Sequence, residues 1–318
     1  MALPVYASPL ERVWYFSRLT ICALIFLFLI SPILVIIPLS FNAEPYFTFT
    51  EKMLAFDPEG YSLRWYDLLL TQPGVPTDVP RDAAWWGQVW REAAWVNAAK
   101  NSVIIGFFST IVATVLGTVA ALGLSRAEMP YRKAVMAILI SPMIVPIIIT
   151  ATGLFFFYSN PCSLLTWTGL AADSCGRLAG TYTGIVLAHA TLGIPFVIIT
   201  VTATLSGFDH SLTRAAASLG ANPTTTFFKV TMPLILPGVI SGALFAFVTS
   251  FDEVVVVLFV AAHDQQTIPR QMWNGIREQI SPAILSVATI LVIVSIGLLA
   301  TVELLRRRSD RLRGVTGV

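Results

Sequence analysis

The sequence predicts an all-α integral membrane protein with six transmembrane helices. Hydrophobic residues make up 56% of the 318-residue chain and charged residues only 12%, whereas soluble domains carry about a quarter charged residues. Several apolar runs exceed the ~18 residues that mark a membrane span. Helices are the expected spanning elements, because open strands would leave backbone hydrogen-bonding groups unpaired in lipid. This composition excludes an ordinary soluble protein.

Six apolar segments are long enough to cross a hydrocarbon core of ~30 Å at 1.5 Å per residue. They cover residues 19–41, 101–124, 134–158, 181–205, 234–260 and 282–305. The first segment is too long for the hydrophobic part of a signal peptide and lacks a small-residue cleavage site. We therefore expect it to be retained as the first transmembrane helix.

The distribution of Lys and Arg predicts that both termini are cytoplasmic. In that orientation the inner segments hold twelve of the 20 basic residues, and the two short outer loops hold three. The other five lie in a long outer loop, where the positive-inside rule has little force. The expected order is a cytoplasmic tail (1–18), the first span (19–41), a periplasmic loop (42–100), a membrane core (101–305) and a basic cytoplasmic tail (306–318). A net charge of only +2 indicates no nucleic-acid partner.

The predicted periplasmic loop is rich in aromatic residues and is interrupted by Pro73, Pro76 and Pro80. Because proline restricts the backbone and ends helices, we expect two short helices or turns joined by a stiff segment. The tryptophans of this loop either form a belt at the membrane interface or contribute to a docking surface for an external partner. The sequence alone favours neither.

Small residues recur at helical spacing along the predicted second span. They are Thr110, Ala113, Thr114, Gly117, Ala120 and Ala121. Small residues let helix backbones approach closely in lipid, where packing holds helices together. This stripe serves either packing within the chain, which is its commoner use, or a seam between subunits.

The predicted cytoplasmic loop 206–233 carries a short amphipathic helix. Leu212, Ala215, Ala216 and Leu219 fall on one face of a helix over 211–219, and Gly220 is placed to end it. Asn222 and Pro223 then turn the chain, and a second short helix is expected over 224–230. An exposed helix of this kind suits insertion into a groove on another protein.

The same loop resembles the EAA loop of ABC-importer permeases. That motif is Glu-Ala-Ala, three residues, Gly, nine residues, and then an aliphatic residue, any residue, an aliphatic residue and Pro. Here it reads Arg214-Ala215-Ala216, Gly220, Val230, Met232 and Pro233, with the spacing intact. Arg214 replaces the Glu of the family and Met232 replaces a Leu, so the ion pair of that Glu does not carry over.

A finer resemblance covers most of the chain. The segments IPLSFN (37–42), YSLRWY (61–66), GTVAAL (117–122), LAHATLGIPFV (187–197), SFDEVVV (250–256) and SPAILSVATIL (281–291) are similar to the spermidine/putrescine (PotC-like) branch of these permeases. The resemblance implies a type I ABC importer permease fold in the inner (plasma) membrane, working by alternating access. The insertion around 73–95 is longer than this branch typically carries.

The resemblance also implies the partners. They are two copies of an ABC ATPase, a second homologous permease that completes a heterodimer, and an extracytoplasmic solute-binding protein. The sequence contains no GxxxxGK[ST] phosphate loop, so ATP and Mg²⁺ are expected on the ATPase, with no cofactor in this chain. The residues expected to couple to the ATPase are Arg214, Ala215, Ala216, Ser218, Leu219, Gly220, Ala221 and Asn222.

Asp252, Glu253 and His189 are ionisable residues inside predicted spans. Asp252 and Glu253 stand about eight residues before the outer end of the fifth span, and His189 about eight residues after the outer start of the fourth, so all three lie ~12 Å from the outer boundary. Such groups usually face a cavity or a partner, and two carboxylates suit a cationic cargo on a translocation pathway. The alternatives are that Asp252 caps a kink or pairs with a cation of the sister subunit, and that His189 is a hydrogen-bonded packing residue.

Cys162 and Cys175 lie thirteen residues apart in one predicted outer loop. An oxidising compartment permits a disulfide between them; the alternative is two free thiols.

The importer permease interpretation has three alternatives. A permease for another small organic solute, such as an amino acid, an opine or a sugar, would use the same scaffold. An intramembrane enzyme is disfavoured, because the sequence has no HExxH, GxSxG or CxxC motif and adjacent Asp252 and Glu253 point ~100° apart on a helix. A stand-alone channel or receptor would not need the EAA-like helix.

Overall fold

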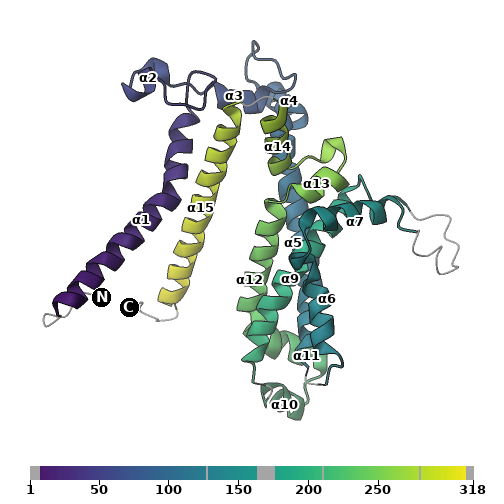
Figure 1. Ribbon diagram of the computed structural model, residues 1–318. Coiled ribbons are helices and arrows are strands. Elements are labelled where there is room, and N and C mark those ends of the chain that lie inside the picture. Colours follow the sequence, from purple (N-terminus) through teal and green to yellow (C-terminus); the bar gives the residue numbers. More distant parts are fainter. Residues whose placement is uncertain (1–7, 127, 163–175, 210, 279–280, 313–318) are drawn as a thin grey trace. The chain divides into compact units, whose positions relative to one another are not determined.

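The computed structural model describes residues 8–126, 128–162, 176–209, 211–278 and 281–312. Every regular element in these ranges is helical (Figure 1), as the sequence predicts. The chain divides into two compact units, one formed by residues 1–85 with 275–318 and the other by residues 86–274. Each unit is described by itself.

The first unit pairs the first and last long helices of the chain. Its elements are α1 (Pro9–Leu39), α2 (Glu51–Leu54), the 3₁₀ turn η1 (Pro58–Gly60), α3 (Arg64–Thr71) and α15 (Ala283–Leu312). α1 begins with a capping box, in which the Ser8 hydroxyl accepts the Glu11 N–H and the Glu11 carboxylate accepts the Ser8 N–H. α15 packs against α1 and α3, and the buried Ser286 hydroxyl donates to the Ser40 carbonyl at 3.3 Å.

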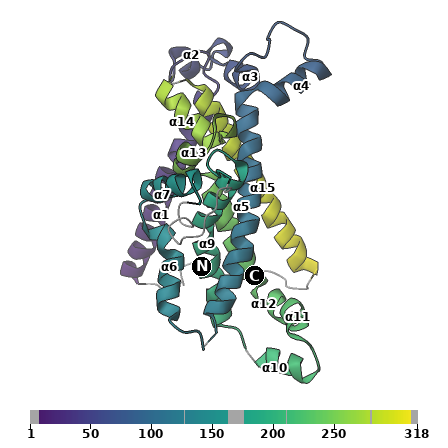
Figure 2. The same cartoon turned by 90° about the vertical axis from the view of Figure 1, so that its right-hand side faces the viewer.

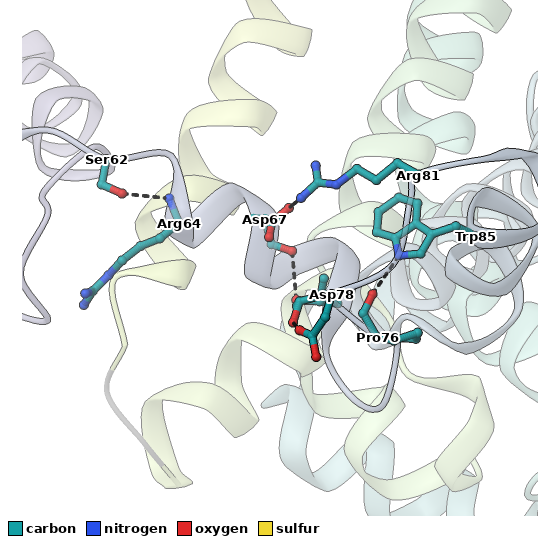
Figure 3. Close-up of polar contacts among 9 residues, drawn as sticks. Ser62, Arg64, Asp67, Pro76, Asp78, Arg81 and Trp85 are labelled. Carbon is teal, nitrogen blue, oxygen red and sulfur yellow. Dashed lines mark hydrogen bonds and ion pairs between the residues drawn. The ribbon is translucent and has the colours of Figure 1, made fainter.

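The proline-containing segment between α3 and the next helix is held in place by polar contacts (Figure 3). The Arg81 guanidinium pairs with the Asp67 carboxylate of α3. The Trp85 indole N–H donates to the Pro76 carbonyl at 2.8 Å. Two helices, α3 and α4 (Ala83–Glu92), flank this segment, which confirms the predicted pair of short helices around the prolines.

The second unit has a three-helix core of α5 (Ala94–Leu124), α9 (Tyr182–Ser206) and α12 (Met232–Phe251), which pack on one another. Around it lie α6 (Arg132–Ile144), α7 (Ile147–Ser159), α10 (Ser211–Ser218), α11 (Pro223–Thr226), the π-helical turn η2 (Phe227–Thr231), α13 (Val255–Val260), the 3₁₀ turn η3 (His263–Gln265) and α14 (Ile268–Glu278). α5 starts seven residues before the predicted second span, 101–124.

The small-residue stripe of α5 packs inside this chain. A Cβ atom on Gly117 would lie 2.7 Å from Cβ of Val197 on α9. A Cβ atom on Gly193 of α9 would lie 3.2 Å from Cβ of Ala113 and 3.0 Å from Cβ of Ala246 on α12. These approaches explain why glycine and alanine occupy the stripe, and they confirm the first of its two predicted uses.

The third predicted span, 134–158, is not one continuous helix. α6 and α7 meet at a bend of 102°. The bend falls at Val145, whose ψ of 136° is extended. Val145 precedes Pro146, and a residue before proline is sterically pushed out of the helical region. The pair forms a broken span or a re-entrant loop.

The fifth predicted span, 234–260, is also interrupted. α12 ends at Phe251, and the chain restarts as α13 at Val255. At the other end of this span the correction is the opposite one. The separate helix expected over 224–230 is continuous, through η2, with α12, so that one apolar helix extends from Pro223 to Phe251.

Within the described ranges, four helices are long and apolar enough to cross a membrane: α1, α5, α9 and the helix Pro223–Phe251. Counting the bent α6–α7 pair as one span gives five. The apolar part of α15, Ala283–Gly297, is shorter. The fold is therefore that of a multi-spanning membrane protein with four or five spans by length and composition.

Candidate functional site

The short helix α10 ends in a Schellman motif. The Gly220 N–H donates to the Ala217 carbonyl at 2.9 Å, and the Ala221 N–H donates to the Ala216 carbonyl at 3.0 Å. Gly220 has φ +82°, a left-handed conformation that a side chain disfavours and glycine adopts freely. The prediction that Gly220 ends this helix is confirmed.

Both flanks of α10 are held by side chains. The Asp209 carboxylate accepts the Ser211 N–H at 2.8 Å and the Ser211 hydroxyl at 2.7 Å. After the helix, the Asn222 amide oxygen accepts the Thr225 N–H at 2.7 Å and caps α11. The loop between α9 and α12 therefore has a defined shape.

α10 lies at one end of the second unit, where α9 ends and α11 begins (Figures 1 and 2). Its apolar side chains are not covered: Leu219 is 89% exposed and Leu212 is 43% exposed. The eight predicted coupling residues, from Arg214 to Asn222, are all exposed or half-buried. An ordered, exposed helix with apolar residues has the properties of a docking element.

A buried hydrogen-bonded cluster joins the three core helices. The Ser250 hydroxyl of α12 is 2.8 Å from Nδ1 of His189 on α9 and 2.8 Å from the Ser109 hydroxyl of α5. His189 is only 1% exposed, and its Nε2 has no hydrogen-bond partner among the described residues. The sequence does not indicate Ser109 or Ser250 as site residues, because a serine in an apolar helix gives no signal of its partner.

The two adjacent carboxylates have different surroundings. Glu253 is 8% exposed, and its Oε1 accepts the Val256 N–H at 3.0 Å, which caps the start of α13. Asp252, at the C-terminal cap of α12, is exposed. Ser250, two residues before Asp252, contacts His189, so the three predicted pathway residues lie in one region of the second unit. Their surroundings differ: His189 and Glu253 are buried, and Asp252 is exposed.

The other end of α13 is held by Arg270 of α14. The Arg270 guanidinium donates to the carbonyls of Val257 at 2.9 Å and Ala261 at 3.4 Å. A carboxylate at the N-terminus and a cation at the C-terminus both complement the helix dipole. Partial burial lowers the pKa of the Arg270 guanidinium from its ordinary value. α13 is thus a short apolar helix fixed at both ends.

Two further expectations concern cysteines and metals. Cys162 is buried, but Cys175 lies outside the described residues, so the Cys162–Cys175 disulfide stays a prediction. Among the residues that the structure describes, His, Cys, Asp and Glu side chains do not gather in groups of three that could hold a metal ion.

Solved structures share the fold. A bacterial ABC transporter involved in the import of the acidic polysaccharide alginate matches with a TM-score of 0.62 at 16% identity, over 95% of this chain and 99% of that one. A bacterial alginate ABC transporter in complex with alginate pentasaccharide-bound periplasmic protein matches with a TM-score of 0.63 at 15% identity, over 97% and 98%. The fold is that of an ABC importer permease.

Curated relatives align along nearly the whole chain. The spermidine/putrescine transport system permease protein PotC of Haemophilus influenzae is 28% identical, over 93% of this chain and 98% of that protein. The putrescine transport system permease protein PotI of Escherichia coli is 29% identical, over 98% of this chain and 97% of that protein. The family described as "Binding-protein-dependent transport system inner membrane component" matches residues 113–313, well over half of the chain. The chain therefore belongs to the family of binding-protein-dependent transport system inner membrane components.

Proposed function

We propose that this inner-membrane permease subunit carries a small cationic solute of the spermidine or putrescine kind. Membership of the family makes the chain a transport subunit of a binding-protein-dependent ABC importer rather than an enzyme. The polyamine assignment is supported by the names of relatives that align over nearly its full length. The exposed Asp252 beside the α12–α13 break also favours a cationic cargo.

The ordered and exposed helix α10 is the observation that carries the proposed mechanism. ATP and Mg²⁺ are bound by the partner ATPase, so movement has to reach the membrane helices through a contact surface. The exposed side chain of Leu219 and the exposed or half-buried Arg214, Ala215 and Ala216 supply such a surface on α10. ATP-driven closure of the ATPase dimer would displace α10, and the spans would alternate between inward-facing and outward-facing states.

The proposed assembly places α10 in the cytoplasm. Two ATPase copies bind there, a second homologous permease completes the pathway, and a solute-binding protein delivers cargo from the other side. This orientation puts both chain termini in the cytoplasm and makes 42–100 the outer loop. In it, the α6–α7 pair is the third span and α15 is the sixth. One solved relative in fold forms a complex with a periplasmic protein.

A permease for a different small solute is the second candidate. The alginate transporters share this fold and import an acidic polysaccharide, which illustrates that a fold does not determine its cargo. Charge discriminates between the two candidates: a pathway for an anionic or neutral solute would gain nothing from an exposed carboxylate at Asp252.

The test is uptake by the reconstituted importer. The chain, its sister permease, the ATPase and the binding protein are purified together and placed in proteoliposomes loaded with ATP. We expect ATP-dependent accumulation of radiolabelled putrescine or spermidine, and none in liposomes loaded with ADP. Uptake of an amino acid or sugar with no polyamine uptake would overturn the cargo, whereas failure of the chain to co-purify with the ATPase would overturn the coupling.

A further inference from the structure

The helix α4 has two faces that differ in burial. Trp85 and Val89 are each 3% exposed, whereas Trp86 is 51% exposed and Trp90 is 61% exposed. Trp86 and Trp90 stand four residues apart, so their rings share one side of the helix. α4 therefore presents two large aromatic side chains outward.

The inward face is fixed by specific contacts. The Trp85 indole donates to Pro76, and the Arg81 guanidinium lies 5.1 Å from the centre of the Trp85 ring (Figure 3). These contacts set the rotation of α4 about its own axis. The outward position of Trp86 and Trp90 is a consequence of this fixed rotation.

The C-terminal end of α4 is attached to the first turns of α5. The Lys100 ammonium lies 4.8 Å from the centre of the Trp90 ring and donates to the Trp90 carbonyl. The Asn97 amide donates to the Arg91 carbonyl at 2.9 Å. Trp90 is therefore held at the height of Lys100 along α5.

Lys100 lies just before an exposed apolar surface of α5. An exposed apolar stripe begins three residues later, about 4.5 Å further along the helix at 1.5 Å per residue. Its side chains are 44–63% exposed and lie on the Lys100 side of α5: Val103, Phe107, Ile111, Val115 and Val119. A lysine at the end of such a stripe extends its ammonium toward the polar boundary. Trp90 thus lies within about one helical turn of the start of this apolar stripe.

We propose that α4 is an interfacial helix whose Trp86 and Trp90 side chains bind among lipid headgroups at the membrane boundary. Tryptophan favours this zone because its ring is apolar and its N–H is polar. α4 runs across the axis of α5 rather than in line with it (Figure 2), as a helix lying along a membrane surface would. The half-buried Lys100 lies over the Trp90 ring, and the exposed Arg91 follows Trp90 in the chain, so both supply positive charge for lipid phosphates. Glu92 is the nearby acidic side chain.

α4 joins α5 at the end of the second unit opposite to α10 (Figure 1). If α10 is cytoplasmic, as the proposed function has it, the lipid that α4 contacts is in the outer leaflet. The lipid contact itself does not depend on the cargo or the orientation. A binding protein is the competing occupant of this face. It would approach from the water, whereas Trp90 is held next to the start of the apolar stripe.

The test is quenching of tryptophan fluorescence by brominated lipid. The assembled importer is reconstituted in phosphatidylethanolamine and phosphatidylglycerol brominated either near the glycerol or near the methyl end of the acyl chains. The wild type is compared with Trp86→Phe/Trp90→Phe. We expect the double variant to lose part of the quenching seen in the wild type, and to lose more of it with the shallow bromine than with the deep one.

Trp95→Phe is the matched control, because Trp95 lies in the first turn of α5 but is only 9% exposed. Its quenching by both lipids should equal that of the wild type. Equal quenching of the wild type and the double variant would overturn the proposal. So would weaker affinity of the double variant for the binding protein, since that result assigns the face to the competing occupant.

Discussion

Gly117 shows how a single residue determines helix packing in this protein. A Cβ atom at this position would lie 2.7 Å from Cβ of Val197 and 3.2 Å from the carbonyl oxygen of Ile194. We predict that Gly117→Ala forces α5 and α9 apart and destabilises the protein by ~1–3 kcal/mol, the usual cost of overpacking. The measurement is the thermal unfolding midpoint of the purified importer in detergent.

Gly123→Ala is the control on the same helix. Nothing lies within 4 Å of a Cβ atom there, and alanine is favoured over glycine in a helix by about 0.5–1 kcal/mol. Its midpoint should be unchanged or higher. Equal midpoints for the two variants would contradict the packing described for α5 and α9.

His189 illustrates what could not be predicted at this scale. Its depth in the fourth span follows from counting residues, and its contact with Ser250 is consistent with that depth. Its direction does not follow, because α9 is apolar around its whole circumference and no polar face reveals which side meets a cavity. The structure buries His189 among helices, which favours a packing role, and its place on the translocation pathway stays a prediction.

At the scale of elements, α10 depends on its C-terminal glycine. A residue with a Cβ atom costs ~1–2 kcal/mol in the left-handed conformation, and Gly220 has φ +82°. We predict that Gly220→Ala frays the last turn of α10 and lowers ATP-dependent uptake. Gly220→Asn should have a weaker effect, because asparagine tolerates this conformation. The measurement is uptake per importer in proteoliposomes.

Gly207→Ala tests whether any change in the same loop is harmful. Gly207 has φ −95°, and the nearest atom to its Cβ position is 3.9 Å away. This variant should transport like the wild type. Normal uptake by Gly220→Ala would mean that the shape of α10 does not matter for coupling.

The end of a helix could be predicted where a single residue has a strong conformational preference for ending or turning the chain. Gly220 ends α10, as expected, and the expected turn at Asn222 and Pro223 also caps and starts α11. The breaks inside apolar runs could not be predicted in the same way. Pro146 bends the third span and Glu253 restarts the chain as α13, but hydropathy averages over such residues, and prolines also occur inside helices here, at Pro195 and Pro237.

At the scale of the whole molecule, the helix break at 252–254 joins local structure to transport. An unbroken helix would satisfy every backbone group internally and would present two adjacent carboxylates in different directions. In the structure the break lets the Glu253 carboxylate accept the buried Val256 N–H at the start of α13 and leaves the Asp252 carboxylate at the surface. Glu253 has a structural partner, and we propose that Asp252 is the carboxylate that meets the cargo.

This division of roles predicts different outcomes for two neutral substitutions. Asp252→Asn removes the charge that would attract a protonated polyamine, so uptake should fall at least about tenfold, which corresponds to ~1.4 kcal/mol. Glu253→Gln keeps an amide oxygen that can accept the Val256 N–H, so its loss of uptake should be smaller. Co-purification with the ATPase checks that both variants assemble. Unchanged uptake by Asp252→Asn, or by the double variant Asp252→Asn/Glu253→Gln, would remove the carboxylates from the pathway and with them the structural reason for a cationic cargo.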